Sequence, residues 1–271
     1  MKNNSIFTAL KGILVGGTML VPGVSGGSMA MILGVYDKLV SSVSSFTKDK
    51  RKNALFLALF SLGGILGMLL LARPILWLIE QYTLPMMYFF LGAVAGGVPL
   101  ILHQAEVKKI SWKSLIYVAA GLLVVCLFAV LPTGDFQSSM EAGPVSFFLL
   151  MLSGFIAAVA LVLPGISVSY LLLLMGLYDE TMRAISELYL PFLIPLGIGL
   201  LLGIVLTTKL LEHAMAKYPQ PTYLIILGFV LGSLAEVFPG IPALPQLPLC
   251  ILMLAAGFTI IRLLSKKEME G

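Results

Sequence analysis

Apolar runs separated by short polar segments make up most of this chain of 271 residues, and six of the runs approach the length of a membrane-spanning helix. A helix rises about 1.5 Å per residue, so about 20 apolar residues cross a hydrocarbon layer of about 30 Å. Runs of this length with so few charged positions favour spanning helices over the buried helices of a soluble protein. We expect these helices near residues 54–79, 85–102, 114–131, 191–211, 221–237 and 248–264.

Two further apolar runs are interrupted by the same Pro-Gly-x-Ser motif. The first reads LVPGVSGGSMAMILGVYD from Leu20 to Asp37, and the second reads VLPGISVSYLLLLMGLYD from Val162 to Asp179. Proline disfavours helix in the residue before it and glycine permits a tight turn, so one helix should end and another begin at each motif. The arm before the first motif, residues 10–21, would be about 18 Å long as a helix and too short to span a bilayer. Each motif is therefore either the break in one spanning helix or the turn of a re-entrant hairpin.

The two motifs belong to an internal repeat that runs along most of the chain. An offset of 142 residues aligns Ser25 with Ser167 without a gap, and after a longer loop in the first half an offset of 136 aligns Arg73 with Lys209. Duplications of this kind are typical of secondary transporters. We expect a single integral membrane domain over residues 1–271, with repeat 1 over 1–135 and repeat 2 over 136–271.

Composition supports the membrane assignment. Hydrophobic residues make up 59% of the chain and charged residues only 11%, and the mean hydropathy is +1.04. A soluble protein of this composition would lack the polar residues needed to cover its surface. No long polar stretch remains from which a second, soluble domain could form.

The distribution of basic residues decides which form the two motifs take. With hairpins at both motifs and a cytoplasmic N-terminus, all 17 Lys and Arg residues except Arg73 and Arg183 fall on the cytoplasmic side. A broken spanning helix would instead place the basic segment 48–52 outside, against the positive-inside rule. Three crossings per half then invert the second half, and the C-terminus is also cytoplasmic. The two hairpin turns should therefore approach each other from opposite faces of the membrane. The predicted fold class is an all-α polytopic membrane protein of two inverted repeats, each a re-entrant helical hairpin plus three transmembrane helices.

The hairpin turns are the candidate substrate site, because irregular backbone at membrane depth is tolerated only where it is buried in protein or lines a polar cavity. Ser25 and Ser167 are placed to cap the helix that follows each turn. The N–H groups of Gly26, Gly27 and Ser28 would point toward an anion, unless the turn is only a packing kink whose serine satisfies its own backbone. The candidate substrate-binding residues at the two turns are Gly23, Ser25, Gly26, Gly27, Ser28, Gly165, Ser167 and Ser169.

Ionisable residues at matched positions add two further hypotheses. Arg73 and Lys209 each follow a long uncharged run, where a cation either snorkels to the lipid headgroups or binds an anionic headgroup as substrate. Asp37 and Asp179 lie where each hairpin ends, and either cap the following helix or form a proton site. Both cysteines lie inside apolar runs, so the sequence indicates no metal site and no cofactor.

At these motifs the sequence resembles a bacterial family of polytopic proteins, long known only as a domain of unknown function, that translocates undecaprenyl phosphate (the PopT type). The resemblance covers nearly the whole chain, and the segment from Leu20 to Asp37 is its most specific part. It implies a flippase in the bacterial cytoplasmic (inner) membrane that returns the polyprenyl-phosphate lipid from the outer to the cytoplasmic leaflet for cell-envelope synthesis. Protons are a candidate coupling ion, and we expect no nucleic acid partner. The chain departs from the family at Val168, where glycine is common, which weakens the case for close backbone approach at the second turn.

Two alternatives from other classes remain. A membrane phosphatase acting on undecaprenyl pyrophosphate also uses inverted repeats and a Pro-Gly-x-Ser loop, but it needs an arginine beside the serine and carboxylates that hold a metal. Gly26 and Val168 occupy the arginine position here, and no paired Glu-x-x-x-Glu lies in a helix. A small-anion transporter or channel could use the same turns with a wetter pore. The interpretation favoured by the sequence is a transporter that is not an enzyme.

Overall fold

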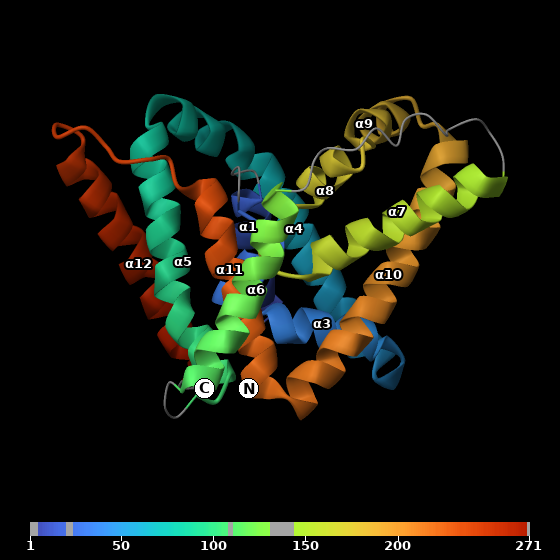
Figure 1. Ribbon diagram of the computed structural model, residues 1–271, viewed down its shortest axis with the longest axis horizontal. Helices are drawn as coiled ribbons and strands as arrows, with labels where there is room; N and C mark the ends of the chain where they lie inside the picture. Colours follow the sequence, from blue (N-terminus) through green and yellow to red (C-terminus); the bar gives the residue numbers. More distant parts are fainter. Residues whose placement is uncertain (1–4, 20–23, 108–110, 131–143, 270–271) are drawn as a thin grey trace.

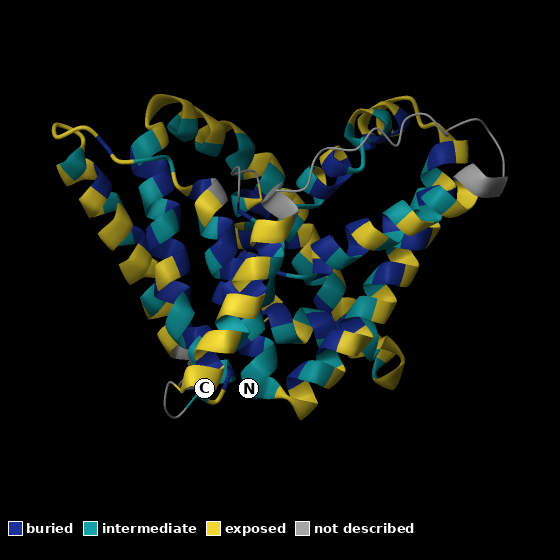
Figure 2. Ribbon diagram, viewed as in Figure 1, coloured by how far each residue is buried: buried dark blue, intermediate teal, exposed yellow. Residues whose placement is uncertain are grey.

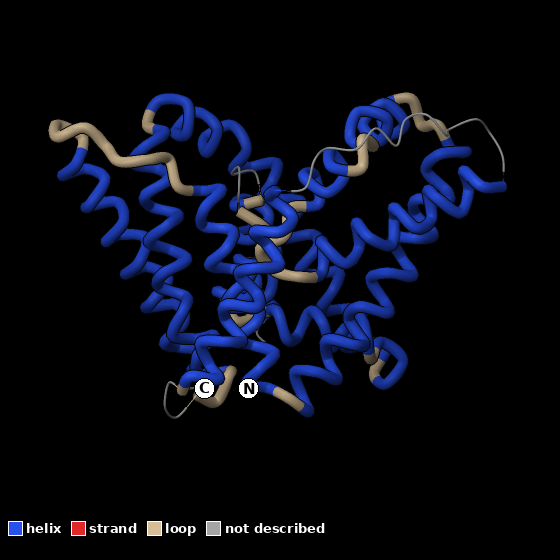
Figure 3. The backbone as a smooth tube through the Cα atoms, in the orientation of Figure 1, coloured by secondary structure: helices blue, strands red, loops and turns tan. Residues whose placement is uncertain are grey.

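A computed structural model describes residues 5–19, 24–107, 111–130 and 144–269, and every regular element within them is helical (Figure 1, Figure 3). The six expected spanning helices correspond to α4, α5, α6, α10, α11 and α12, and each Pro-Gly-x-Ser motif lies between a longer and a shorter helix. In chain order the elements are α1 Ser5–Thr18, α2 Gly26–Ile32, α3 Tyr36–Ser44, the 3-10 helix η1 Phe46–Lys48, α4 Lys50–Gln81, α5 Thr83–Gln104, α6 Trp112–Val130, α7 Pro144–Val162, α8 Val168–Leu174, α9 Tyr178–Ser186, α10 Leu190–Lys217, α11 Pro219–Val237 and α12 Leu247–Met269.

The outer helices carry the apolar surface that a lipid environment requires. Among the described residues, α4, α5, α10 and α12 are long and apolar enough to cross a membrane, and α6 and α11 are apolar but shorter. Leu69 of α4 and Leu210 of α10 are each 72% exposed, and Figure 2 shows exposed residues along α10 and α12. Soluble monomers rarely expose contiguous apolar patches beyond a few hundred Å². The protein is therefore an all-α polytopic membrane protein.

Helix pairing follows the same order in both halves of the chain. α1 packs along α4 and α7 along α10, while α5 packs along α12 and α11 along α6. Glycines allow these close approaches, because a Cβ added at Gly63 of α4 would lie 2.3 Å from the Ala9 carbonyl oxygen, and one at Gly199 of α10 would lie 1.8 Å from the Met151 oxygen. In Figure 1, α5 and α12 lie on one side of the molecule and α7 and α10 on the other.

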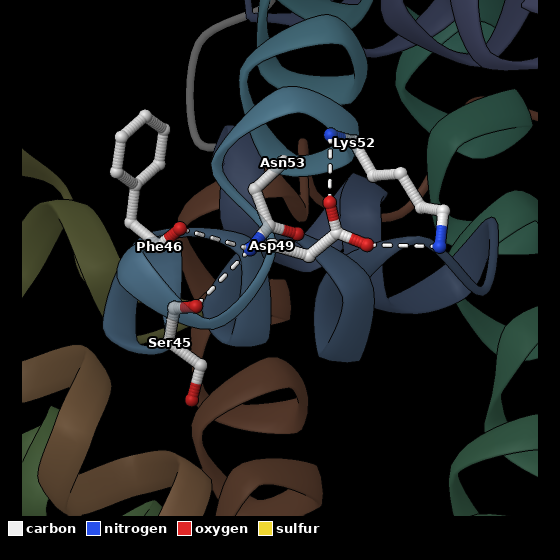
Figure 4. Close-up of polar contacts among 5 residues, drawn as sticks. All are labelled: Ser45, Phe46, Asp49, Lys52 and Asn53. Atoms are coloured by element: carbon white, nitrogen blue, oxygen red, sulfur yellow. Dashed lines mark hydrogen bonds and ion pairs between the residues drawn. The ribbon is translucent and has the colours of Figure 1, made fainter.

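A polar cap fixes the start of α4, the longest helix (Figure 4). The Asp49 carboxylate accepts a hydrogen bond from the Lys52 backbone N–H at 3.3 Å and forms an ion pair with the Lys52 ammonium at 2.8 Å. The Asn53 amide donates to the carbonyl oxygens of Ser45 at 3.1 Å and Phe46 at 3.4 Å. The Asp49 side chain satisfies one of the N–H groups that a helix start leaves unpaired, and the Asn53 side chain ties the first turn to the segment before it. α4 therefore begins at Lys50 rather than at the expected residue 54.

The turn after each short helix is the same in the two halves. Gly34 and Gly176 adopt left-handed conformations with φ of +67° and +66°, which glycine reaches without a Cβ clash. Their N–H groups donate to the carbonyl oxygens of Met31 and Leu173, closing a common type of helix end. Each turn aims the following helix, α3 or α9, away from the short helix before it. α3 and α9 lie at opposite ends of the molecule (Figure 1).

Candidate substrate cavity

The two Pro-Gly-x-Ser turns contact each other. The Ser25 hydroxyl of the first turn accepts a hydrogen bond from the Gly165 N–H of the second turn at 3.0 Å. Gly27 lies against the same segment, since a Cβ there would be 3.2 Å from the Pro164 Cα atom. The prediction that the turns converge is therefore confirmed.

Local chemistry explains the shape of the second turn. Pro164 follows closely on the end of α7 at Val162, as the restriction before proline predicts. Gly165 then takes φ of +83°, and a Cβ there would lie 2.3 Å from the Phe229 carbonyl oxygen of α11. Only glycine satisfies both conditions, so this residue has a structural reason independent of any ligand.

Tyr36 ties the end of the first hairpin to the second. Its side chain is 4% exposed, and its hydroxyl donates to the Val162 carbonyl oxygen at 2.6 Å. That carbonyl is the last of α7, where a helix leaves acceptors unpaired. Pro164 prevents α7 from continuing, which leaves the Val162 carbonyl without a helical partner. The Tyr36 hydroxyl supplies the missing hydrogen bond.

A cavity of about 890 Å³ lies where the two turns meet. It is bounded by α1, α2, α3 and α4 from the first half and by α7, α8, α9 and α10 from the second, with the loops between them. Its described lining is apolar and hydroxyl-bearing, and contains no Asp, Glu, Lys, Arg or His. The hydroxyl-bearing residues of the lining are Ser25, Tyr36, Ser61, Ser167, Ser169, Tyr178 and Thr208.

The lining hydroxyls differ in whether they can donate to a ligand. The Ser25 oxygen accepts from the N–H groups of Ser28 and Gly165 and also bonds the Ser28 hydroxyl at 2.8 Å, so its capacity is used within the protein. The Ser167 oxygen accepts from the Tyr170 N–H at 3.3 Å, which leaves its hydrogen free to donate. The Ser169 hydroxyl has no hydrogen-bond partner among the described residues.

Two hydroxyls outside the turns also face the cavity. Ser61 of α4 lines it and has no partner among the described residues. Thr208 of α10 also lines it, but donates within its own helix to Ile204 at 2.7 Å. Neither residue carries a motif, and only the packing of α4 and α10 on the hairpins brings them to the cavity. Sequence reasoning missed both for that reason.

Not all of the predicted substrate-binding residues line the cavity. Ser28 is 2% exposed and absent from the cavity lining, because its N–H and hydroxyl bond to Ser25. Arg73 and Lys209 are exposed on the outer faces of α4 and α10 and do not line the cavity. Gly23 lies outside the described residues. The turn residues that the structure brings to the lining are Ser25, Gly26, Gly27, Gly165, Ser167 and Ser169.

One end of the cavity is closed by α3. Leu39, Val40 and Val43 of α3 line the cavity, and the helix packs against α10. The hydroxyls of Ser44 and Ser45, at the end of α3, donate to the Glu212 carboxylate of α10. In the described part of the chain α9 makes no comparable contact with α4, so the end of the cavity near α9 lacks the equivalent closure.

Comparisons with known proteins agree on one family. A family model described as undecaprenyl phosphate translocase-like matches residues 15–245. The chain is 33% identical over 244 residues to a polyprenyl-phosphate transporter of Staphylococcus aureus, and the alignment covers 86% of each protein. It is 30% identical over 250 residues to a polyprenyl-phosphate transporter of Vibrio cholerae, covering 87% of this chain and 78% of the relative. No solved structure matches.

Proposed function

The chain belongs to the undecaprenyl phosphate translocase-like family, and from this premise we propose that it is a flippase that carries polyprenyl phosphate from the outer to the cytoplasmic leaflet of the bacterial inner membrane. It is a transporter and not an enzyme. Return of the lipid phosphate to the cytoplasmic side would make it available again as a carrier for envelope synthesis.

The observation that carries this proposal is the chemistry of the cavity. An anionic phosphate accepts hydrogen bonds, and Ser61, Ser167 and Ser169 offer hydroxyl donors that the described protein does not use. The remaining lining is largely apolar and suits an isoprenoid chain. Pockets of about 300–1,000 Å³ hold drug-sized ligands, so this cavity has room for the headgroup and the first isoprene units while the rest of the tail stays in the bilayer.

The backbone of the first turn is the second part of the proposed headgroup site. Gly26 and Gly27 both line the cavity, and without side chains they let a phosphate oxygen approach the backbone N–H groups. Gly27 also has a packing reason to be glycine, because the second turn lies against it. Gly26 is the cleaner reporter of the site, since the three atoms nearest to a Cβ there all belong to the flexible Met19 side chain, with the sulfur at 2.8 Å.

The proposed architecture is a pair of inverted repeats whose hairpins enter the membrane from opposite sides. The recurrent helix pairing and the matching turns at Gly34 and Gly176 support the repeat, and the positive-inside distribution supports the inversion. With this topology the end closed by α3 faces the cytoplasm. In this conformation the cavity would then take the lipid from the outer leaflet.

Arg73 and Lys209 fit a role outside the cavity. Both are exposed, on α4 and α10, which also contribute side chains to the cavity wall. In the proposed topology one lies toward the outer leaflet and the other toward the inner leaflet. Each would attract a lipid phosphate electrostatically before or after it occupies the cavity.

Binding of polyprenyl phosphate to the purified protein tests the site. Each hydroxyl bonded to a charged phosphate contributes about 1.5–3 kcal/mol, so Ser167→Ala with Ser169→Ala should weaken binding by about a hundredfold or more. Ser186→Ala is the matched control, because Ser186 is exposed and donates to the Arg183 carbonyl away from the cavity. Equal affinity in the double variant and the control would refute the assigned donors, and equal competition by inorganic phosphate would favour a small-anion transporter.

A further inference from the structure

A carboxylate beside the cavity is held by two other helices. Asp37 lies in the first turn of α3, where its Oδ2 atom accepts hydrogen bonds from the Tyr223 hydroxyl of α11 at 2.8 Å and from the Gln104 amide of α5 at 3.1 Å. These bonds join α3 to α5 and α11. Neither donor carries a positive charge.

The other oxygen of each group has no partner. Asp37 Oδ1 and Gln104 Oε1 are both buried without a hydrogen bond. A buried acceptor left unpaired costs about 1–3 kcal/mol, and an ionised oxygen costs more. Among the described residues, two acceptors therefore lack a hydrogen bond, and they belong to two groups that already share one.

A single proton would satisfy both atoms. A carboxylic acid and a primary amide form a paired contact in which the amide N–H donates to one carboxyl oxygen and the acid O–H donates to the amide oxygen. The Gln104 Nε2 to Asp37 Oδ2 bond is already one half of that pair. Resting on the proposed function, we propose that Asp37 is protonated in this conformation and is the proton site that couples the transporter to the proton gradient.

The titratable and charged groups that surround Asp37 fit an uncharged, protonated carboxyl group. Tyr36 and Tyr223 interact with it, and both are phenols. On α3, the Lys38 ammonium lies over the Phe56 ring at 5.6 Å from its centre. From α10, Glu212 accepts from the serines at the far end of α3.

Helix α12, which packs along α5, contributes a cation near Gln104. Arg262 of α12 has a buried Nη1 atom without a partner, and the parallel packing of α12 on α5 places it about one turn before Gln104. His103 and Glu106, which flank Gln104 in sequence, are exposed. An ion pair between Arg262 and an ionised Asp37 is the competing arrangement, and it would leave the Gln104 oxygen unpaired.

Coupling follows from the position of α3. Opening the cavity toward the cytoplasm requires α3 to leave α10, and movement of α3 would separate Asp37 from Gln104 and Tyr223. In water the Oδ1–H bond then breaks, the proton goes to cytoplasmic water and the carboxylate remains. The repeat-related Asp179 is exposed, so it is a matched control position that lacks the buried carboxyl–amide pair.

The pH dependence of stability tests proton binding without reference to transport. The folded protein would hold a proton that the unfolded chain releases above about pH 4, so stability should fall as the pH rises above that value until the folded protein also releases it. Asp37→Asn can still form a hydrogen-bonded pair with Gln104 but cannot titrate. Its thermal midpoint in detergent should therefore rise relative to that of the parent as the pH increases. Asp179→Asn should follow the parent. A constant difference between Asp37→Asn and the parent across the pH range would overturn the proposal.

Infrared spectroscopy and transport complete the test. The parent at neutral pH should show a protonated carboxyl C=O band that is lost in Asp37→Asn and kept in Arg262→Gln; absence of that band in the parent would establish the ion pair instead. In liposomes, acidifying the outer side should accelerate inward movement of labelled polyprenyl phosphate by the parent, and the effect should be lost in Asp37→Asn. A retained effect would overturn the coupling role. If the band is present but no lipid moves in the parent, the proton site stands and the proposed function fails.

Discussion

Removal of one hydroxyl should separate the roles of the two repeat-related serines. Ser25→Ala and Ser167→Ala each delete a helix cap worth about 1 kcal/mol, since each oxygen accepts from the backbone N–H three residues on. Ser25 alone also accepts from the buried Gly165 N–H. Leaving that donor unpaired costs a further 1–3 kcal/mol or so, with the lower figure expected if cavity water replaces the hydroxyl.

The free energy of unfolding should therefore fall by about 2–4 kcal/mol in Ser25→Ala and by about 1 kcal/mol in Ser167→Ala. Equilibrium unfolding in detergent, followed by the helical circular dichroism signal, measures both. Ser25→Thr is the control, because it retains an oxygen at the same position and should recover most of the loss. Equal losses in the two alanine variants would refute the conclusion that Ser25 fastens the two turns together.

Three further tests address other parts of the account. Gly199→Ala should disrupt the packing of α10 on α7 and lower the thermal midpoint, whereas Gly197→Ala in the same helix, with open space around it, should raise stability slightly; the reverse order would contradict the packing. Gly26→Leu should abolish lipid movement while the protein remains folded, and parental transport would remove the first turn from the phosphate site. Arg73→Gln or Lys209→Gln should slow lipid movement with unchanged stability, and parental rates in both would leave these cations only a snorkelling role.

The positions of the spanning helices could be predicted from the sequence because lipid imposes a minimum length and an apolar composition on them. The second hairpin was less predictable. The repeat aligns α7 with α1, but α1 has 14 residues whereas α7 has 19, from Pro144 to Val162. Proline is favoured at the start of a helix, where its missing N–H leaves no bond unmade.

The repeat also predicted that the two turns would meet, because matched elements approach each other across an axis in the membrane. It could not predict how they meet. Ser25 and Ser167 are equivalent in the sequence, yet the first fastens the turns together and the second keeps a hydrogen free for a ligand. Similarly, nothing in the pattern around Asp37 indicates Gln104, which lies on a helix 67 residues away in the chain. These differences arise from tertiary packing, which a local motif does not encode.

Leaflet-resolved movement of a labelled polyprenyl phosphate in liposomes, with and without the purified protein, tests the central claim most directly. The account predicts that the protein accelerates movement of the lipid phosphate, that the matching polyprenol without phosphate moves no faster than in protein-free liposomes, and that Ser167→Ala with Ser169→Ala abolishes the acceleration. Movement of the lipid phosphate at the same rate in protein-containing and protein-free liposomes would contradict it.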